Sequence, residues 1–179
     1  GFAIANVEPL KSSRGVPYIA ALPRIASEAD VKSSFLVAER LRLCSGRYYA
    51  LCDESGEFVG LESNGHDCRS QAQLHTHTNH YIFGEAAQWE GRREYGTLSE
   101  RRRISAERRL GDLDQIDADS LLSLVRYHDG TPESILQTGE GRKTRTGACF
   151  VIDPSHRLMW YTSSISDYRE AHSLSLEVT

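Results

Sequence analysis

Residues 74–81 (LHTHTNHY) bring together three of the seven histidines and one asparagine. In an extended strand alternate side chains share a face, so His75, His77 and Asn79 would point to one side and His80 to the other. A histidine can ligate zinc or hydrogen-bond structurally, whereas an amide donates a hydrogen bond to an oxyanion without titrating. The segment is therefore a candidate for metal ligation, for structural hydrogen bonding, or for binding of an oxyanion or substrate.

A zinc hydrolase would use His75, His77 and His80 as ligands. Protein zinc sites need three or four well-placed ligands, and no neighbouring cluster of Cys, Asp or Glu completes this set. We therefore expect no metal. The four cysteines form no CxxC pair and are too few for a disulfide-stabilised scaffold, so we expect buried, reduced thiols rather than nucleophiles. They are Cys44, Cys52, Cys68 and Cys149.

Two further patterns have a functional and a structural interpretation. His128 and Asp129 resemble a catalytic dyad, but residues 129–132 (DGTP) are a favourable turn sequence, which favours a structural role. Residues 97–111 contain five arginines that could bind an anion such as a coenzyme A phosphate, although a solvated helix face is the simpler interpretation. These arginines are Arg101, Arg102, Arg103, Arg108 and Arg109.

The elements that must position these side chains alternate between helices and antiparallel hairpins. Pro23 should break or kink the first helical piece. Ser27, with Glu28 and Asp30, should start the second piece, and Asp119 or Ser120 should cap the last helix. We predict a strand at 2–8, helices in 16–43, a hairpin of 48–52 with 57–62, helices at 97–111 and 118–128, and a hairpin of 147–152 with 157–162. This order predicts a layered α+β sandwich, and without repeats or a Gly/Ser linker it predicts a single domain over residues 1–179.

The composition excludes several classes of protein. The chain has 179 residues, of which 39% are hydrophobic and 26% charged, with a formal net charge of −4, so it is not a disordered or collagen-like chain. This weakly acidic balance gives no general attraction to nucleic acid or to an anionic membrane surface. No apolar run approaches the roughly 20 residues that span a bilayer, and we expect a cytoplasmic protein.

Residues 77–81 (HTNHY) resemble the HTNHF-type signature of the acyl-coenzyme A:6-aminopenicillanic acid acyltransferase family, also called the C45 autoproteolytic peptidase family. Other pieces of the chain are similar to that family in the same order. They are residues 1–6 (GFAIAN) with 15–17 (GVP), 48–56 (YYALCDESG) with 59–63 (VGLES), 99–110, 128–135 (HDGTPESI, followed by Leu136 where the family has Cys), and 147–158.

The resemblance implies an N-terminal-nucleophile αββα sandwich that is incomplete in this chain. Members of the family cut themselves before a Cys, which becomes the N-terminal nucleophile. Gly1 has no side-chain thiol or hydroxyl, and none of the four cysteines stands at a matching position. We therefore expect this chain to be the C-terminal part of a larger enzyme, with the Cys on an upstream segment or a second chain.

The resemblance also assigns roles to residues. Asn79 would donate to the oxyanion, and Arg145 or Arg142, ahead of the last hairpin, would orient charges around the nucleophile, with Arg145 favoured because it is nearer the strand. His77, Tyr81 and Trp89 would bind the substrate, although core packing explains the aromatic residues equally well.

The function implied is an acyltransferase or amidohydrolase that acts on a small-molecule non-peptide amide or a thioester. It would need no resident cofactor, although a coenzyme A thioester could be the acyl donor, and the chain could form an oligomer. The alternative is a catalytically inactive binding or assembly module that has lost the nucleophile half.

Overall fold

A computed structural model describes residues 2–6, 14–73, 76–90, 93–139, 145–162 and 172–175. Within these residues the chain is a mixed α+β protein with two antiparallel sheets and several helices, which confirms the predicted fold class at that level. The chain divides into two compact units, Gly1–Ser99 and Glu100–Thr179. The expectation of a single domain stays a prediction.

The first unit is built on a four-stranded antiparallel sheet with the order β1-β2-β3-β4. Its strands are β1 (Phe2–Asn6), β2 (Arg47–Cys52), β3 (Phe58–Ser63) and β4 (Cys68–Gln71). The predicted hairpin is confirmed, with Tyr49 of β2 opposite Leu61 of β3. Asp53 shapes its turn by accepting hydrogen bonds from the backbone N–H (2.9 Å) and the hydroxyl (2.6 Å) of Ser55.

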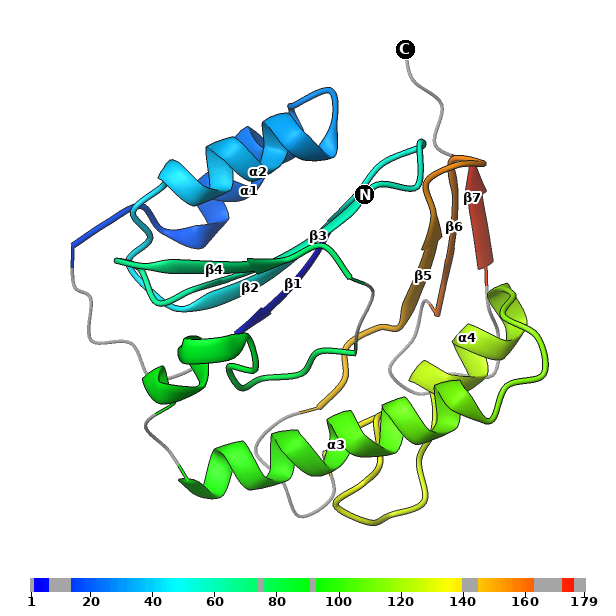
Figure 1. Ribbon diagram of the computed structural model, residues 1–179. Helices are drawn as coiled ribbons and strands as arrows, with labels where there is room; N and C mark the ends of the chain where they lie inside the picture. The colour runs from blue at the N-terminus through cyan, green and yellow to red at the C-terminus, as the bar shows by residue number, and fades with distance from the viewer. Residues whose placement is uncertain are drawn as a thin grey trace. The chain divides into compact units, whose positions relative to one another are not determined.

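Two helices, α1 (Tyr18–Ala26) and α2 (Val31–Arg40), lie over one face of this sheet (Figure 1). Because side chains alternate along β2, Tyr49 and Leu51 enter the core under these helices, whereas Tyr48 belongs to a second cluster with Tyr81, Phe83 and Ala86. The first core contains Ala21, Ile25, Val31, Ala38, Leu43, Tyr49, Leu51 and Leu61. The opposite face of the sheet therefore meets the segment that carries the histidines.

Of the two predicted effects of Pro23, a break of the helix is wrong, because Pro23 lies inside α1. The backbone hydrogen bond that proline cannot make would go to the carbonyl of Ile19, a residue that is 67% exposed and so open to water. The chain leaves the helix at Ser27, and Asp30 caps α2 by accepting a hydrogen bond from the Ser33 N–H at 2.7 Å, as predicted for this region.

Gly15 lies where two backbone segments meet. The Val16 N–H donates to the Arg42 carbonyl at 2.7 Å, and the Cys44 N–H donates to the Val16 carbonyl at 3.0 Å. A Cβ atom on Gly15 would lie 2.6 Å from the carbonyl oxygens of Arg42 and Leu43. This approach leaves no room for a side chain at Gly15.

After β4 the described chain runs without regular structure through residues 76–83 and then forms the 3-10 helix η1 (Gly84–Trp89). A strand was considered for the histidine segment, and this is wrong for residues 76–83. The long helix α3 (Arg93–Gly111) begins in the first unit and continues into the second, where the predicted helix 97–111 is confirmed.

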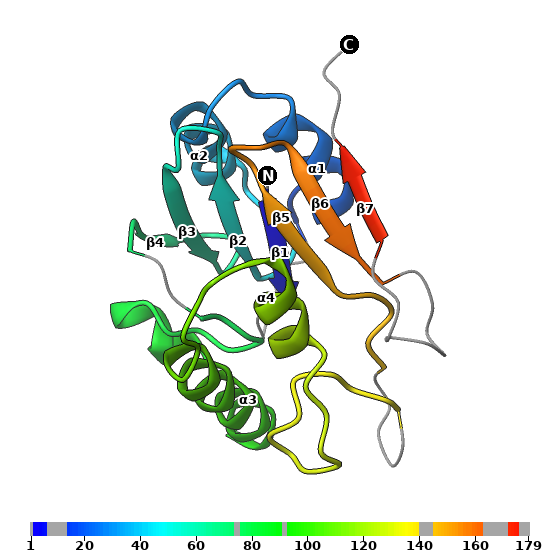
Figure 2. The ribbon, with the colours of Figure 1, turned by 90° about the vertical axis from the view of Figure 1, so that its right-hand side faces the viewer.

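The second unit contains α4 (Ala118–Val125) and a three-stranded antiparallel sheet (Figure 2). Its strands are β5 (Phe150–Asp153), β6 (Leu158–Tyr161) and β7 (His172–Ser175), and α4 packs against β5 and β6. The β5–β6 hairpin is confirmed, whereas the predicted cap of α4 is wrong. Asp117 is the N-cap and forms a reciprocal capping box with Ser120. The side chain of each residue accepts a hydrogen bond from the backbone N–H of the other.

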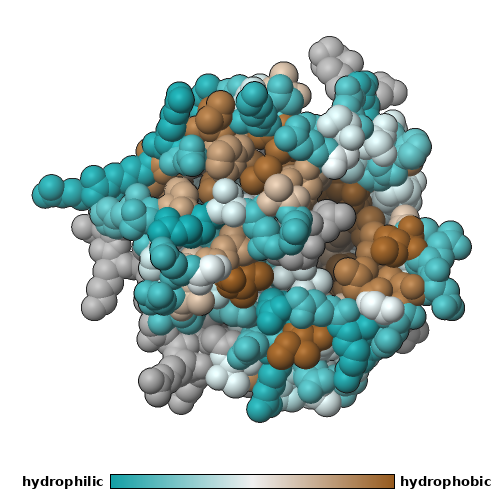
Figure 3. All heavy atoms as spheres, in the orientation of Figure 1, coloured by the Kyte–Doolittle hydropathy of each residue, from teal (hydrophilic) through white to brown (hydrophobic). Residues whose placement is uncertain are grey.

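Apolar side chains gather on the side where α4 and the three-stranded sheet lie (Figure 3). Phe150 and Leu174 expose 53% and 45% of their surface. Phe150, Tyr161 and His172 are aligned across the three strands as successive ring contacts. In the described part of the chain, no helix has the length and apolar character that a membrane span requires.

Candidate functional site

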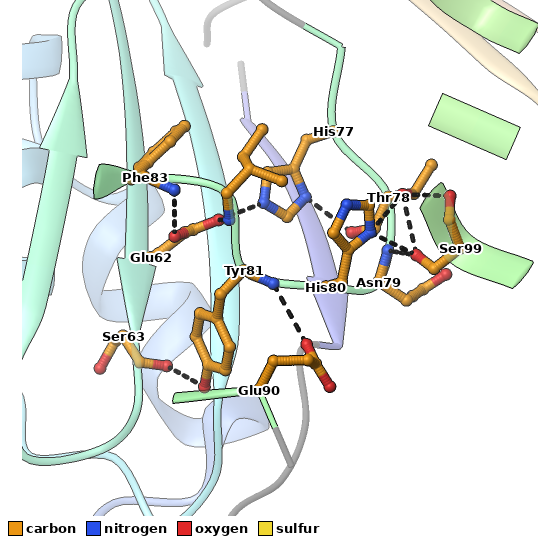
Figure 4. Close-up of polar contacts among 11 residues, drawn as sticks. Glu62, Ser63, His77, Thr78, Asn79, His80, Tyr81, Phe83, Glu90 and Ser99 are labelled. Carbon is orange, nitrogen blue, oxygen red and sulfur yellow. Dashed lines mark hydrogen bonds and ion pairs between the residues drawn. The ribbon is translucent and has the colours of Figure 1, made fainter. Parts of the chain in front are cut away.

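Glu62 of β3 and His77 of the irregular segment 76–83 (the histidine segment) form a buried pair (Figure 4). Their side chains are 0% and 3% exposed, and Glu62 Oε1 lies 2.7 Å from His77 Nε2. The carboxylate also accepts hydrogen bonds from the backbone N–H groups of Ile82 (2.7 Å) and Phe83 (3.0 Å). Three donors therefore compensate the charge of a carboxylate that is closed to water.

The His77 ring is held on every side. Its Nδ1 lies 2.6 Å from the Thr78 carbonyl oxygen, and the ring stacks on Tyr48 with centroids 3.6 Å apart and planes 1° from parallel. Both ring nitrogens therefore lie within hydrogen-bond distance of an oxygen, Nδ1 of the Thr78 carbonyl and Nε2 of the Glu62 carboxylate, and these contacts fix the orientation of the ring. Burial, together with the Glu62 charge, raises the pKa of Tyr48, so the stacked phenol stays neutral.

Ser99 of α3 holds the next part of the segment from the other side. Its carbonyl accepts the Thr78 hydroxyl at 2.9 Å, and its Oγ accepts the Asn79 N–H at 2.7 Å. The same Oγ lies 2.9 Å from Thr78 Oγ1 and from His80 Nδ1. Ser99 is fully buried and His80 is 8% exposed, so these contacts are shielded from competing water.

Asn79 is thus fixed through its neighbours while remaining partly exposed. Figure 4 shows it on the Ser99 side of the segment, away from the Glu62–His77 pair. A side-chain amide on a backbone held in this way can donate a hydrogen bond to developing negative charge without first reorganising. The geometry is therefore suitable for an oxyanion donor, and the assignment itself stays a prediction.

The residues predicted to bind substrate differ in how open they are. Tyr81 is 2% exposed and donates its hydroxyl to the Ser63 carbonyl at 3.3 Å, and Trp89 packs edge-to-face on it at 5.3 Å. Trp89 is partly exposed and lies under the Arg69 guanidinium, 5.4 Å from its ring centroid. The structure places Tyr81 and His77 in the interior and Trp89 at its edge, so Trp89 is the most accessible of the three.

The predicted arginines belong to another part of the chain than Asn79. Arg145 is exposed in the second unit, and a Cβ atom on Gly139 would lie 3.5 Å from its Cβ. Arg142 and His75 lie outside the described residues. The assignments of Arg145 and Arg142 stay predictions.

Three of the four thiols have a raised pKa. All four cysteines are free, and Cys149 is buried. Burial raises the pKa of the thiols of Cys52, Cys68 and Cys149, which opposes formation of the nucleophilic thiolate. The expectation of free thiols is confirmed for all four, whereas full burial is confirmed for Cys149 and not for Cys44, Cys52 and Cys68, which are partly buried.

His128 and Asp129 serve a turn. The Asp129 carboxylate accepts hydrogen bonds from the hydroxyls of Tyr127, Thr131 (2.7 Å) and Ser134 (2.7 Å), which hold its pKa well below the ordinary value. His128 Nδ1 lies 3.1 Å from the Leu136 carbonyl oxygen. These contacts favour the structural interpretation over a catalytic dyad.

Several of the α3 arginines contact groups of this chain. Arg103 pairs with Glu107, and Arg108 with Glu133 at 3.6 Å. Arg109 lies over the Tyr127 ring, 3.1 Å from its centroid. These contacts reduce the charge that the helix offers to an anion such as a coenzyme A phosphate.

Within the described residues there is no group of three or more His, Cys, Asp or Glu side chains that could hold a metal ion. A cavity of about 240 Å³ lies elsewhere in the first unit, lined by Glu39, Arg40, Leu41, Arg42, Ser63, Gly65, His66 and Cys68.

Two residues of the site carried no functional prediction, namely Glu62 and Ser99. A signal for Glu62 was present, since an acidic residue in the strand-like run 59–63 (VGLES) needs a partner once it is buried. Ser99 had no comparable signal, because a serine in a charged helix is ordinary. The chain matches neither a known protein-family model nor a curated protein, so the site is interpreted from its own geometry.

Proposed function

We propose that the chain is part of an N-terminal-nucleophile acyltransferase or amidohydrolase of the C45 type, with Asn79 as the oxyanion donor. The observation that carries the proposal is that buried contacts hold the histidine segment on both sides of Asn79's position. Glu62 contacts His77, and Ser99 accepts the Asn79 N–H. Electrostatic catalysis requires donors that are oriented before charge develops, and these buried contacts supply such orientation. The HTNHY sequence supports the family assignment.

The proposed reaction passes through an acyl-enzyme. The thiol of an N-terminal Cys gives its proton to its own α-amino group, and the sulfur attacks the carbonyl carbon of a small-molecule amide or thioester. Asn79 donates a hydrogen bond to the oxyanion of the tetrahedral intermediate. The carbon–nitrogen or carbon–sulfur bond of the substrate then breaks, and the α-ammonium group returns the proton to the leaving group. Water or an amine attacks the thioester in turn, which breaks the acyl–sulfur bond and restores the thiol.

The nucleophile in this proposal comes from an upstream segment or a second chain. The raised pKa values of the Cys52, Cys68 and Cys149 thiols support this, because these groups are poorly suited to attack a carbonyl. A coenzyme A thioester could act as the acyl donor. Arg145 or Arg142 would orient charges near the nucleophile.

The proposed fold follows the same resemblance. Each unit contains an antiparallel sheet with helices packed on it, α1 and α2 in the first and α4 in the second. These are the kinds of layer from which an αββα sandwich is assembled, and we propose that this is their arrangement.

The test begins with the protein produced from its complete reading frame. Intact mass and N-terminal sequencing should reveal self-cleavage immediately before a Cys. A chloroacetamide probe should then label that residue, and hexanoyl p-nitroanilide and hexanoyl-coenzyme A should be tested for release of nitroaniline or free thiol. A single chain without cleavage, labelling or turnover of either compound would exclude the proposal.

The alternative is a catalytically inactive binding or assembly module. It is favoured by one observation, the burial that suppresses three of the thiols. The chloroacetamide experiment separates the two functions. The enzyme requires fast labelling of one thiol in the folded protein, whereas the module predicts that labelling becomes fast only after denaturation.

A further inference from the structure

We propose that Ser99 is the positioning residue for Asn79, a role that rests on the function proposed above. Ser99 lies on α3 and Asn79 in the irregular segment, and they are joined by the hydrogen bond from the Asn79 N–H to Ser99 Oγ at 2.7 Å. The serine is completely buried, so water cannot replace this acceptor in the folded chain.

One assignment of the hydrogen atoms uses every donor and acceptor position of the Ser99 hydroxyl. A hydroxyl has one donor and two acceptor positions. The Asn79 N–H and an Nδ1–H of His80 fill the acceptor positions, and the Ser99 hydroxyl hydrogen goes to Thr78 Oγ1 at 2.9 Å. The Thr78 hydroxyl in turn donates to the Ser99 carbonyl at 2.9 Å. One helical residue thereby contacts three consecutive residues of the segment.

This arrangement fixes the backbone from which the Asn79 side chain projects. The residues on both sides of Asn79 are anchored to Ser99, so the peptide planes flanking Asn79 cannot rotate without breaking a buried hydrogen bond. An error of about 1 Å in the position of a catalytic group can cost on the order of a hundredfold in rate. Ser99 would therefore influence the reaction through Asn79 and without touching the substrate.

The chain provides a matched control in Ser105. It lies on the same helix, is 2% exposed, and its hydroxyl has no hydrogen-bond partner among the described residues. Ser105→Ala therefore makes the same chemical change in a buried part of α3 without removing a contact to the segment.

The first measurement is amide hydrogen exchange, which needs no substrate. Ser99→Ala should accelerate exchange of the Asn79 amide about tenfold, because it loses its acceptor. The Ile82 amide, which donates to Glu62, is the internal reference and should be unchanged in the same variant. Ser105→Ala should leave both amides unchanged. An Asn79 amide that exchanges equally in Ser99→Ala and the parent protein would overturn the proposal.

The second measurement asks whether Ser99 acts through Asn79. With hexanoyl p-nitroanilide or hexanoyl-coenzyme A as the probe, Ser99→Ala should lower kcat about tenfold with little change in KM. In the Asn79→Ala background the same change should have no further effect, because the donor it positions is absent. An equal loss in both backgrounds would show a general structural role and refute the proposal.

The two measurements separate failure of this inference from failure of the proposed function. If the protein shows no self-cleavage, no labelled thiol and no turnover of either probe compound, the enzyme proposal fails, while hydrogen exchange still decides whether Ser99 holds Asn79. If turnover is found but Ser99→Ala leaves it unchanged, only the positioning role fails. Should Ser99→Ala not fold, Ser99→Cys, which has a weaker acceptor, gives the same readouts.

Discussion

The carboxylate of Glu62 and the imidazole of His77 lie 2.7 Å apart, and both side chains are closed to solvent. Glu62 comes from β3 and His77 from the irregular segment that follows β4. The carboxylate also binds the N–H groups of Ile82 and Phe83, so one buried side chain fixes the segment at three points.

Glu62→Gln should strongly destabilise the first unit. An amide NH2 group in place of Oε1 would face the Ile82 N–H, and in place of Oε2 the Phe83 N–H, and leaving such buried donors unsatisfied costs about 1–3 kcal/mol. Urea unfolding measures this loss. Glu85→Gln is the matched control, since Glu85 pairs with Arg69 at 3.0 Å but its side chain is 75% exposed. An effect of Glu62→Gln as small as that of Glu85→Gln would contradict a buried carboxylate that holds the Ile82 and Phe83 amides.

Tyr49→Phe should maintain or raise stability at neutral pH. The Tyr49 hydroxyl is buried and has no hydrogen-bond partner among the described residues, so its removal relieves a desolvation cost of about 1 kcal/mol or more. Tyr81→Phe is the contrasting variant and should destabilise the protein, because the Tyr81 hydroxyl donates to the Ser63 carbonyl. Thermal unfolding should give a lower Tm for Tyr81→Phe than for the parent, and an equal or higher Tm for Tyr49→Phe.

The same tyrosine predicts a loss of stability in alkali. Burial raises the pKa of Tyr49 from 10.0 to about 12. The folded state therefore holds the phenol proton more tightly than the unfolded chain, and this contribution is complete below pH 10 and is lost as the pH rises through about 12. Tyr49→Phe should reduce the slope of unfolding free energy against pH in that window. Equal slopes for the parent and the variant would argue against a buried phenol.

Asn79→Ala should lower kcat on the order of a hundredfold with little change in KM, if Asn79 donates to the oxyanion. Asn79→Asp keeps the size but replaces a donor with an acceptor, so its loss should be at least as large. Asn64→Ala is the control, because Asn64 accepts hydrogen bonds only from the turn amides of His66 and Asp67 in the contacts described. Unchanged turnover in Asn79→Ala would remove the central site assignment.

Asp129→Ala should weaken the turn that follows α4, and the effect should disappear in acid. The hydroxyls of Tyr127, Thr131 and Ser134 hold the Asp129 pKa well below 3.8. Its contribution is therefore present above the unfolded value near 3.8 and is lost as the pH falls below it. Unfolding curves for the parent and Asp129→Ala should converge in acid. At neutral pH Asp114→Ala, at an exposed loop position, should unfold like the parent.

Local patterns predicted the regular elements well because their causes are local. The hairpin of β2 and β3 follows from β-rich runs around a Gly-containing turn, and α2 from an aspartate cap and apolar periodicity. The cap of α4 was misplaced by two or three residues, because Asp117, Asp119 and Ser120 are all good capping residues and only the backbone geometry selects among them. A break at Pro23 was one of two predicted effects and is wrong, because a proline is tolerated inside a helix where the carbonyl that loses its donor is open to water.

The irregular path of the histidine segment could not be predicted from the alternation of residue types in its sequence. Its amides bond to side chains from distant parts of the chain, Asn79 to Ser99 and Ile82 to Glu62, in place of a neighbouring strand. Such pairings depend on tertiary contacts between residues about 20 positions apart. The sequence identified Asn79 as a candidate, whereas the residues that support it required the structure.

Gly15 has a consequence for sequence variation. Since any Cβ there would lie 2.6 Å from two carbonyl oxygens, even alanine would push apart the start of α1 and the chain that leaves α2. The constraint is steric and independent of catalysis, so it applies equally to an enzyme and to an inactive module. Homologous chains with this fold should keep glycine at this position even where the asparagine of the HTNH segment has been lost.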